Sequence, residues 1–269
     1  MMAIITISRG SYTRGKEIAE KTAQKLGYAC ISREVLINAS KNFNIPEIKL
    51  IHAIEDAPSF FDRFTHGKEK YIAYIRAALF KQLKEDNIVY HGFAGCFFVK
   101  DLPQVLKVRI ISETEDRIKI VMARDKIPRK EAMRRVKKVD DQRKKWGLKL
   151  YGIDPGDPSL YDLVVHINNI MVKDAVATIC QIARLKQFQT THESKRALED
   201  IALAAKVETF LIDVKPRAEV RVEDGFVSLK TTVPPAQESV LVNKIGEVMK
   251  MIQEVKGIKI VTEKHPNDT

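Results

Sequence analysis

The sequence predicts a three-layer α/β domain with a parallel sheet, followed by a small α+β domain. Three observations support this. Strand-like and helix-like segments alternate over the first 190 residues, a glycine-bounded loop joins the first strand to the first helix, and a hairpin pattern replaces the alternation after a polar stretch at 187–194. Strands separated by helices pair in parallel, whereas a hairpin pairs its strands antiparallel. We therefore expect domains at residues 1–190 and 191–269.

The first strand, loop and helix form a pattern typical of phosphate binding. The apolar run 3–7 predicts a strand, and the apolar face of 17–26 predicts a helix that Gly27 ends. Between them residues 10–16 read Gly-Ser-Tyr-Thr-Arg-Gly-Lys, which fits Gly-x4-Gly-Lys. Glycines let the backbone bend around an anion, and the helix N-terminus adds partial positive charge. Lys16 would contribute a full charge to the β- and γ-phosphates of a nucleotide.

This loop also departs from the usual pattern. Glu17 stands where such loops carry the Ser or Thr that contacts Mg²⁺, and bulky Tyr12, Thr13 and Arg14 fill positions that are often small. Arg14 is either a second phosphate ligand or an exposed loop residue. The alternative for the whole segment is an ordinary strand–turn–helix with an exposed lysine.

The other elements of the first domain follow in order. Further strands are expected at 28–31, 87–91, 105–111 and 163–167, and helices at 33–40, 46–55, 68–85, 114–125, 128–145 and 172–187. Residues 57–67 and 152–158 are expected to be loops. Ligands of such sheets bind at the carboxyl ends of the strands, which is where the glycine loop lies.

One segment carries most of the positive charge. Residues 118–145 contain 12 basic and 4 acidic side chains, a net charge of +8 out of +11 for the whole chain. Such a segment is either an anion-binding surface or a solvated helix face. Its aromatic residues are few, with Trp146 and Tyr151 just beyond it, so it lacks stacking platforms and nucleic acid is an unlikely partner.

The last part of the chain has its own pattern. A helix at about 194–206 precedes a strand at 218–223, an Asp224-Gly225 turn and a partner strand at 226–230. An amphipathic helix over about 241–255 ends at Gly257, and a final strand follows at 258–261.

Composition limits the class of protein. The chain is 45% hydrophobic and 30% charged, and no apolar run approaches the roughly 20 residues of a membrane-spanning helix. Its N-terminus leads directly into a strand without the pattern of a signal peptide. Cys30, Cys96 and Cys180 are odd in number and lie in apolar segments, which favours core thiols and no metal site. We expect a cytoplasmic protein without a transmembrane segment.

The opening of the chain resembles the cytidylate kinase-like family. Ile5-Thr6-Ile7-Ser8-Arg9 and Gly15-Lys16-Glu17-Ile18-Ala19 are similar to the family's Ile-Thr-Ile-Ser-Arg, glycine loop and Gly-Arg-Glu-Ile-Ala. Further similar segments lie at 32–36, 88–92, 102–108, 140–143 and 156–163, so the resemblance covers about 3–185.

The resemblance implies a P-loop nucleoside monophosphate kinase fold that moves the γ-phosphoryl group of ATP, with Mg²⁺, to an acceptor such as CMP or dCMP. Lys16 and Arg143 would be catalytic, and the nucleotide phosphates would lie on residues 10–17, namely Gly10, Ser11, Tyr12, Thr13, Arg14, Gly15, Lys16 and Glu17. The acceptor would contact Arg33, His91 and Asp140, and Asp140 would orient either the base or an arginine of the lid. The basic segment would be a helical lid that includes Arg134 and Arg135.

Two departures from the family leave a second hypothesis open. His91 stands where relatives carry an arginine, and it is either a weaker phosphate ligand or a buried histidine at a strand end. Gly10 replaces the more usual glutamine. A nucleotide-sensing protein with weak or lost catalysis is therefore the alternative to an active kinase.

The C-terminal segment resembles a BON domain. The similarity rests on Val222–Leu229, which contain the glycine hairpin, and on Val255–Val261, which contain the closing strand. The resemblance implies a regulatory or docking module with a protein or lipid ligand. A stability or dimerisation module is the alternative.

Overall fold

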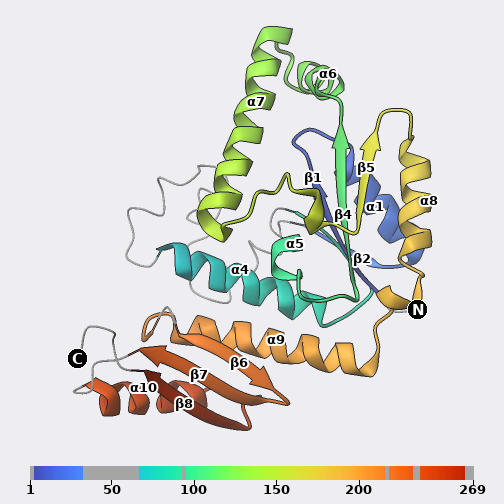
Figure 1. Ribbon diagram of the computed structural model, residues 1–269. Coiled ribbons are helices and arrows are strands. Elements are labelled where there is room, and N and C mark those ends of the chain that lie inside the picture. Colours follow the sequence, from blue (N-terminus) through green and yellow to red (C-terminus); the bar gives the residue numbers. More distant parts are fainter. Residues whose placement is uncertain (1–2, 33–66, 93–94, 216–217, 233–236, 264–269) are drawn as a thin grey trace. The chain divides into compact units, whose positions relative to one another are not determined.

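The computed structural model describes residues 3–32, 67–92, 95–215, 218–232 and 237–263 (Figure 1). The helices expected at 33–40 and 46–55 lie outside the described residues. By their contacts the described residues form two compact units. Unit 1 contains the described parts of 1–37 and 85–190, and unit 2 contains those of 59–84 and 191–269.

Unit 1 is built on a parallel sheet, as the alternating pattern predicts. Its strands pair in the order β2-β3-β1-β4-β5, and every pairing is parallel. Their bounds are Ile4–Arg9 for β1, Ala29–Ile31 for β2, Ile88–His91 for β3, Val105–Ser112 for β4 and Leu163–Ile167 for β5. Each lies within a residue or two of the range expected from the sequence.

The helices of unit 1 connect these strands. They are α1 (Gly15–Leu26), α5 (Gly95–Phe98), α6 (Thr114–Asp125), α7 (Arg129–Trp146) and α8 (Val172–Ile182). The described residues of unit 1 also include a π-helical turn at Gly147–Tyr151 and short 3-10 turns at Pro158–Leu160 and Lys186–Phe188. The helix expected at 172–187 therefore ends at Ile182, and a 3-10 turn follows it.

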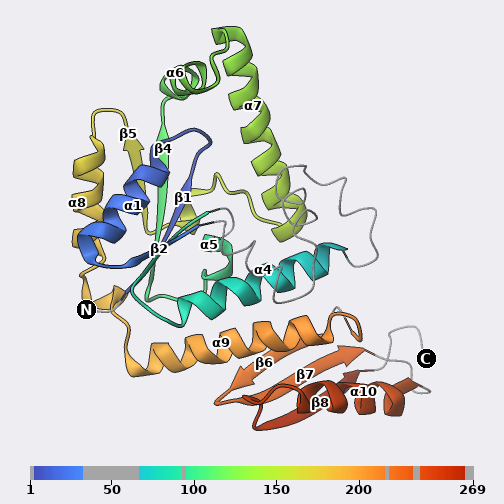
Figure 2. The ribbon, with the colours of Figure 1, turned by 180° about the vertical axis from the view of Figure 1, so that it is seen from behind.

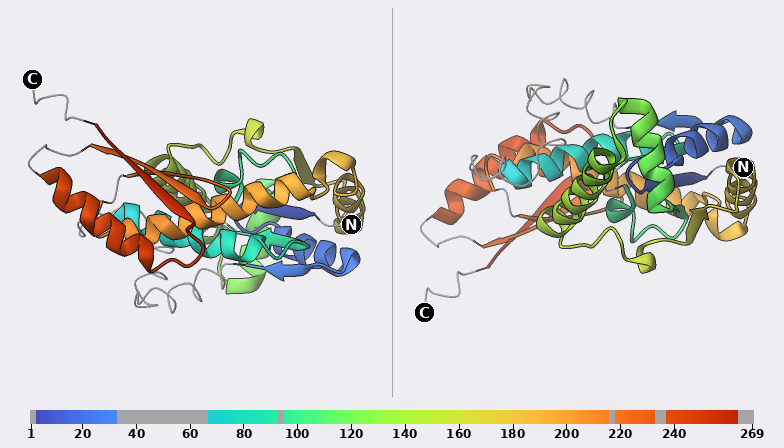
Figure 3. Two further views of the ribbon diagram at one scale, coloured as in Figure 1. Left: turned by 90° about the horizontal axis from the view of Figure 1, so that it is seen from below. Right: turned by 90° about the horizontal axis from the view of Figure 1, so that it is seen from above.

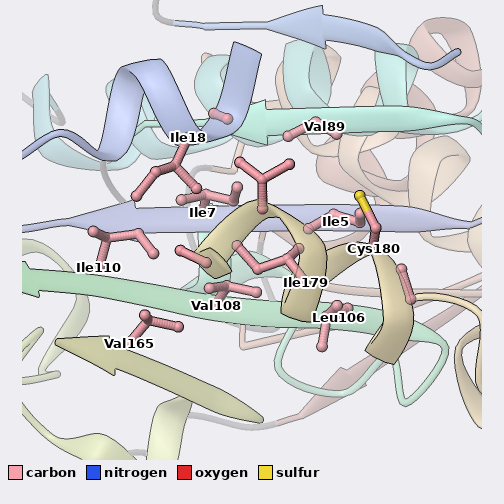
Figure 4. Packing of buried hydrophobic residues seen from close by; sticks show 14 of the residues in the cluster. Ile5, Ile7, Ile18, Val89, Leu106, Val108, Ile110, Val165, Ile179 and Cys180 are labelled. Atoms are coloured by element: carbon pink, nitrogen blue, oxygen red, sulfur yellow. The ribbon is translucent and has the colours of Figure 1, made fainter. Parts of the chain in front are cut away.

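The core of unit 1 lies between the sheet and the helices α1 and α8. Ile5 and Ile7 of β1 are almost wholly buried and pack with Ile18 of α1 and Ile179 of α8 (Figure 4). Burial of each such side chain contributes about 1.5–3 kcal/mol. Ile4 and Thr6, which point to the other face of β1, are also buried, so both faces of this strand are covered, as is usual for parallel sheets.

The strand order defines where a ligand would bind. β1 lies between β3 and β4, with Ile7 opposite both His91 and Val108. After β1 the chain continues to β2, at one edge of the sheet, and after β4 it continues to β5, at the opposite edge. Such a reversal opens a crevice at the carboxyl ends of the two strands, and the glycine loop starts at the end of β1.

The described residues of unit 2 form three helices and a small mixed sheet (Figures 1 and 3). Its helices are α4 (Gly67–Leu83), α9 (His192–Leu211) and α10 (Glu238–Lys250), and its strands are β6 (Glu219–Glu223), β7 (Phe226–Thr232) and β8 (Gly257–Glu263). β6 and β7 are antiparallel, and β8 pairs parallel to β7. The hairpin and closing strand expected from the sequence are therefore present.

Local contacts explain the hairpin and the position of α4. Asp224 and Gly225 both have positive φ, at 51° and 81°, as a tight two-residue hairpin turn requires. Asp200 of α9 accepts hydrogen bonds from both of their backbone N–H groups, at 2.9 and 3.1 Å. α4 precedes β3 in the chain, yet it belongs to unit 2 because it packs along α9 (Figure 2).

Candidate functional site

The loop between β1 and α1 is held at both of its ends. The Gly10 N–H donates to the Ile110 carbonyl of β4 at 3.0 Å, which fixes the loop beside the neighbouring strand end. The Thr13 hydroxyl donates to the Gly10 carbonyl at 3.2 Å and accepts from the Gly15 N–H at 3.3 Å. Thr13 is bulky for such a loop, but its buried side chain braces the turn from inside.

The second glycine of the pattern is required by close packing. A Cβ atom at Gly15 would lie 2.6 Å from Cβ of Arg9, closer than two such atoms can approach. Gly15 therefore lets the first turn of α1 lie directly against the end of β1. The Gly15 N–H is taken up by Thr13, but the next N–H groups of that turn have no partner within the helix, and such groups at a helix N-terminus favour an anion.

Tyr12 links the loop to the hairpin of α6 and α7. Its backbone φ is 56°, in the left-handed region that non-glycine residues rarely adopt. Its ring packs against the apolar cluster that α6 and α7 share, and the Arg124 guanidinium lies 4.8 Å from the ring centre. The bulky side chain thus faces the helical hairpin.

Arg117 of α6, Asp140 of α7 and Ser11 of the loop form one network. The Arg117 Nε donates to the Ser11 carbonyl at 2.7 Å, and its Nη2 donates to both carboxylate oxygens of Asp140, at 2.7 and 2.6 Å. The Ser11 hydroxyl donates to Asp140 at 2.6 Å and accepts from Arg117. The loop is therefore bound to both helices of the hairpin.

Further arginines converge on the same place. Arg143 of α7 donates from Nη1 to the Arg9 carbonyl at 2.7 Å, at the carboxyl end of β1. Burial, together with the charges of Arg9 and Arg117, lowers the pKa of Arg143 to about 10, whereas Asp140 opposes the shift. A half-buried set of guanidinium groups beside one carboxylate is a favourable environment for an additional anion.

The charged residues at the start of α1 point elsewhere. The Lys16 ammonium is 3.7 Å from Glu20, and its side chain is 62% exposed. Glu17 pairs with Lys21 at 2.7 Å and with Arg14 at 3.9 Å. The structure thus brings Ser11, Asp140 and Arg143 together but places Lys16, Arg14 and Glu17 on the outer surface of α1.

The remaining predicted residues are scattered. His91 is buried at the carboxyl end of β3, and Arg33 lies outside the described residues. Arg134 is exposed on α7, whereas Arg135 is 2.5 Å from Asp125 and 3.5 Å from Glu131. Arg124 and Arg135 lower the pKa of Asp125 to about 2. Arg135 therefore holds α7 to α6 in this structure.

Sequence reasoning missed two groups of residues. Arg117 is a single arginine among many in a basic segment, so nothing in the pattern distinguishes it. Arg109 and Tyr161 also meet beside Ser8 of β1. Arg109 donates to the Tyr161 hydroxyl at 3.1 Å, and the Tyr161 hydroxyl lies 3.2 Å from the Ser8 hydroxyl. Their positions within β4 and shortly before β5 were the available indication.

Within the described ranges, no group of three or more His, Cys, Asp or Glu side chains could hold a metal ion. The helices of the same ranges also include none with the length and hydrophobicity to cross a membrane.

A five-stranded parallel sheet with a glycine loop after its central strand defines an α/β P-loop kinase fold. The chain belongs to the cytidylate kinase-like family, whose model matches residues 4–169.

Individual proteins are similar at lower levels. A cytidylate kinase of Sulfolobus acidocaldarius is 25% identical over 175 residues, which cover 64% of this chain and 90% of that protein. A cytidylate kinase of Pyrobaculum neutrophilum is 28% identical over 116 residues, and the match covers 43% of this chain and 62% of that protein. The crystal structure of an uncharacterized protein from Eubacterium ventriosum has a TM-score of 0.54 at 21% identity and covers 68% of this chain and 98% of that one.

Proposed function

We propose that this protein transfers the γ-phosphoryl group of ATP to a nucleoside monophosphate, with CMP or dCMP as the favoured acceptor. The observation that carries the proposal is the glycine loop at the end of β1, tied to β4 by Gly10 and surrounded by Arg9, Arg117 and Arg143. Membership of the cytidylate kinase-like family and the relatives named cytidylate kinase support the same activity.

In this proposal the loop and the lid bind the triphosphate together. Residues 10–17 hold the phosphates by backbone N–H groups, and Arg143 contacts the transferring group from α7. Lys16 reaches the same group by rotating about its flexible stem. Its exposed pairing with Glu20 is worth at most about 1 kcal/mol, so this rotation costs little.

The acceptor and the lid are assigned on the same basis. Arg33, His91 and Asp140 contact the acceptor nucleotide, and α6 and α7 form a lid in which Arg134 and Arg135 face the phosphates when it closes. Phosphoryl transfer needs alignment, charge neutralisation and exclusion of water, so these residues would act by position and charge. Bound Mg²⁺ would neutralise phosphate charge.

We also propose a separate role for the C-terminal part of the chain. Residues 1–190 would be the catalytic domain in the cytoplasm, and 191–269 a BON-like module that regulates it or binds a protein or lipid. The support is the succession of α9, the β6–β7 hairpin, α10 and β8 around one apolar core. A stability or dimerisation role is the alternative.

The test is a phosphoryl-transfer assay with ATP, Mg²⁺ and each nucleoside monophosphate. We expect turnover with CMP or dCMP that falls by at least about 100-fold in Lys16→Ala, because a transition-state charge contact is removed. Lys21→Ala is the matched control, since Lys21 lies on the same helix and, like Lys16, pairs with a glutamate of that helix, in its case Glu17. Equal activity in all three proteins would contradict the role given to Lys16.

The second candidate is a nucleotide-sensing protein without efficient catalysis. It is favoured by the network in which Asp140 takes up hydrogen bonds from Ser11 and Arg117, and by the outward position of Lys16. ATP binding by calorimetry without turnover of any acceptor would support this candidate. Turnover with CMP would exclude it.

A further inference from the structure

A groove in unit 2 is not explained by phosphoryl transfer. It lies between α10 and β8 and has a volume of about 490 Å³. Val242 of α10 and Ile258 and Ile260 of β8 form its apolar part, and Glu238 and Lys250 lie among the charged residues that line it. A Cβ atom at Gly246, in the middle of this lining, would meet no atom within 4 Å. The groove is therefore open where a second helix or strand could enter.

The same groove borders an unpaired sheet edge. Among the strands that the structure describes, β8 pairs only with β7. Ile258 and Ile260 stand opposite Val227 and Leu229, which are buried, so all four point to the face of the sheet that α10 covers. Ile258 is nevertheless 38% exposed. An exposed edge with apolar side chains is a template for pairing with another strand.

We propose that this edge and groove form a homodimer, in which β8 of one chain pairs antiparallel with β8 of a second copy. Pairing centred on Ile260 places Ile258 opposite Thr262 of the second copy, and opposed residues in an antiparallel pair point to the same face. The two grooves then adjoin on one face of a continuous six-stranded sheet, and each supplies apolar surface to cover the other.

The charges at the ends of the groove suit a second copy. Glu238 at the start of α10 contacts Thr262 near the end of β8, and the link 251–256 joins Lys250 at the end of α10 to Gly257 at the start of β8. The helix and the strand therefore run in opposite directions. A two-fold axis at Ile260 therefore brings Lys250 of one chain to the end of the groove that holds Glu238 of the other. The pair occurs twice in the dimer, and this self-complementarity favours a second copy over an unrelated peptide.

The first test is the mass of the full chain in solution. Sedimentation at rising concentration should show conversion from 30.6 kDa to twice that mass. Ile258→Lys should abolish the dimer because it places a charge in the joined grooves. Phe226→Lys is the matched control, since Phe226 is 59% exposed and lies on the opposite face of the sheet. A monomer at about 100 μM, or a dimer that Ile258→Lys leaves unchanged, would overturn the proposal.

The second test is an exchange of charges. Lys250→Glu and Glu238→Lys should each weaken dimerisation by roughly five- to ten-fold, and the double variant should restore it. Because Ile258→Lys could impair folding, hydrogen exchange of the unmodified chain gives a separate measurement. Backbone amides at 258–262 should gain protection as the concentration rises. Protection that is independent of concentration would indicate another occupant of the edge and overturn the dimer. None of these measurements depends on the proposed kinase activity.

Discussion

Tyr12 shows how one residue serves both the loop and the lid. Its positive φ costs roughly 1–2 kcal/mol, and the ring offsets this cost by packing against α6 and α7 and beneath Arg124. The sequence shows only that the residue is bulky for a phosphate-binding loop. The reason for its size is a contact with side chains more than 100 positions away in the chain.

Substitutions at Tyr12 should separate the cost of its positive φ from the stabilisation by its ring contacts. Tyr12→Ala should lower the free energy of unfolding by about 2–3 kcal/mol, because the ring contacts are lost while the strained φ remains. Tyr12→Gly should be about 1 kcal/mol more stable than Tyr12→Ala, since glycine adopts positive φ freely. Urea denaturation measures both values. A glycine variant less stable than the alanine variant would show that the backbone is not strained.

Cys96 gives a prediction for pH dependence. Burial raises the pKa of its thiol from 9.0 to about 11, with a smaller opposite effect from the hydrogen bond with Tyr161. The folded protein therefore holds this proton more tightly than the unfolded chain. The stability that this provides is complete below pH 9 and is lost as the pH rises toward 11, by about 2–3 kcal/mol in total.

The measurement compares the unmodified chain with Cys96→Ala between pH 8 and pH 11. The stability advantage of the unmodified chain should shrink as the pH rises. The comparison also includes a smaller contribution from Tyr161, whose pKa is raised to about 12 mainly by burial and in part by Cys96. A difference between the two proteins that stays constant with pH would contradict the assignment.

At the scale of elements, most of unit 1 could be predicted from the sequence. The run 3–7 and the hydrophobic periodicity of 17–26 depend on local patterns, and both elements lie where they were expected. The pairing of α4 with α9 could not be predicted, because it joins segments separated by more than 100 residues and an amphipathic helix does not specify its partner. The arginines at the site differ in the same respect. Arg143 could be predicted from a family motif, whereas the position of Arg117 depends on tertiary contacts that the sequence does not show.

The α4–α9 contact contains an ion pair that can be tested. Arg76 lies 2.5 Å from Glu208, and the two side chains are 29% and 23% exposed. Burial raises the pKa of Glu208, and the Arg76 charge opposes that shift. Arg76→Met should remove this opposition, so the pKa of Glu208 should rise further. We expect a loss of about 2–4 kcal/mol of unfolding free energy at pH 8.

The loss of unfolding free energy should be smaller at pH 5. A carboxyl group whose pKa is raised by folding stabilises the folded protein at low pH, where it is protonated, and this stabilisation disappears as the pH rises. Chemical denaturation at both pH values measures it. Glu208→Gln in the Arg76→Met background should recover most of the lost stability. An equal loss at pH 5 and pH 8 would show that the ion pair does not determine the effect.

At the scale of the whole molecule, charge and topology indicate the same place. The chain carries a net charge of +11, of which +8 lies in 118–145, and α6 and α7 bring part of that charge to the loop after β1. Anion affinity at this place should fall as the salt concentration rises, since exposed charges are screened within about 10 Å at 0.1 M salt. The fold thus brings part of the positive charge of the chain to one site.

The central claim is that this site binds the phosphates of a nucleotide, and calorimetry of the full chain with ATP and Mg²⁺ tests it most directly. We expect saturable heat of binding that Arg143→Met weakens by at least about ten-fold, because a half-buried guanidinium beside the loop is lost. Lys145→Met, which removes an exposed charge from the same helix, should change the affinity by less than about three-fold. Absence of heat with ATP and GTP at millimolar concentration, or equal effects of the two substitutions, would contradict the account.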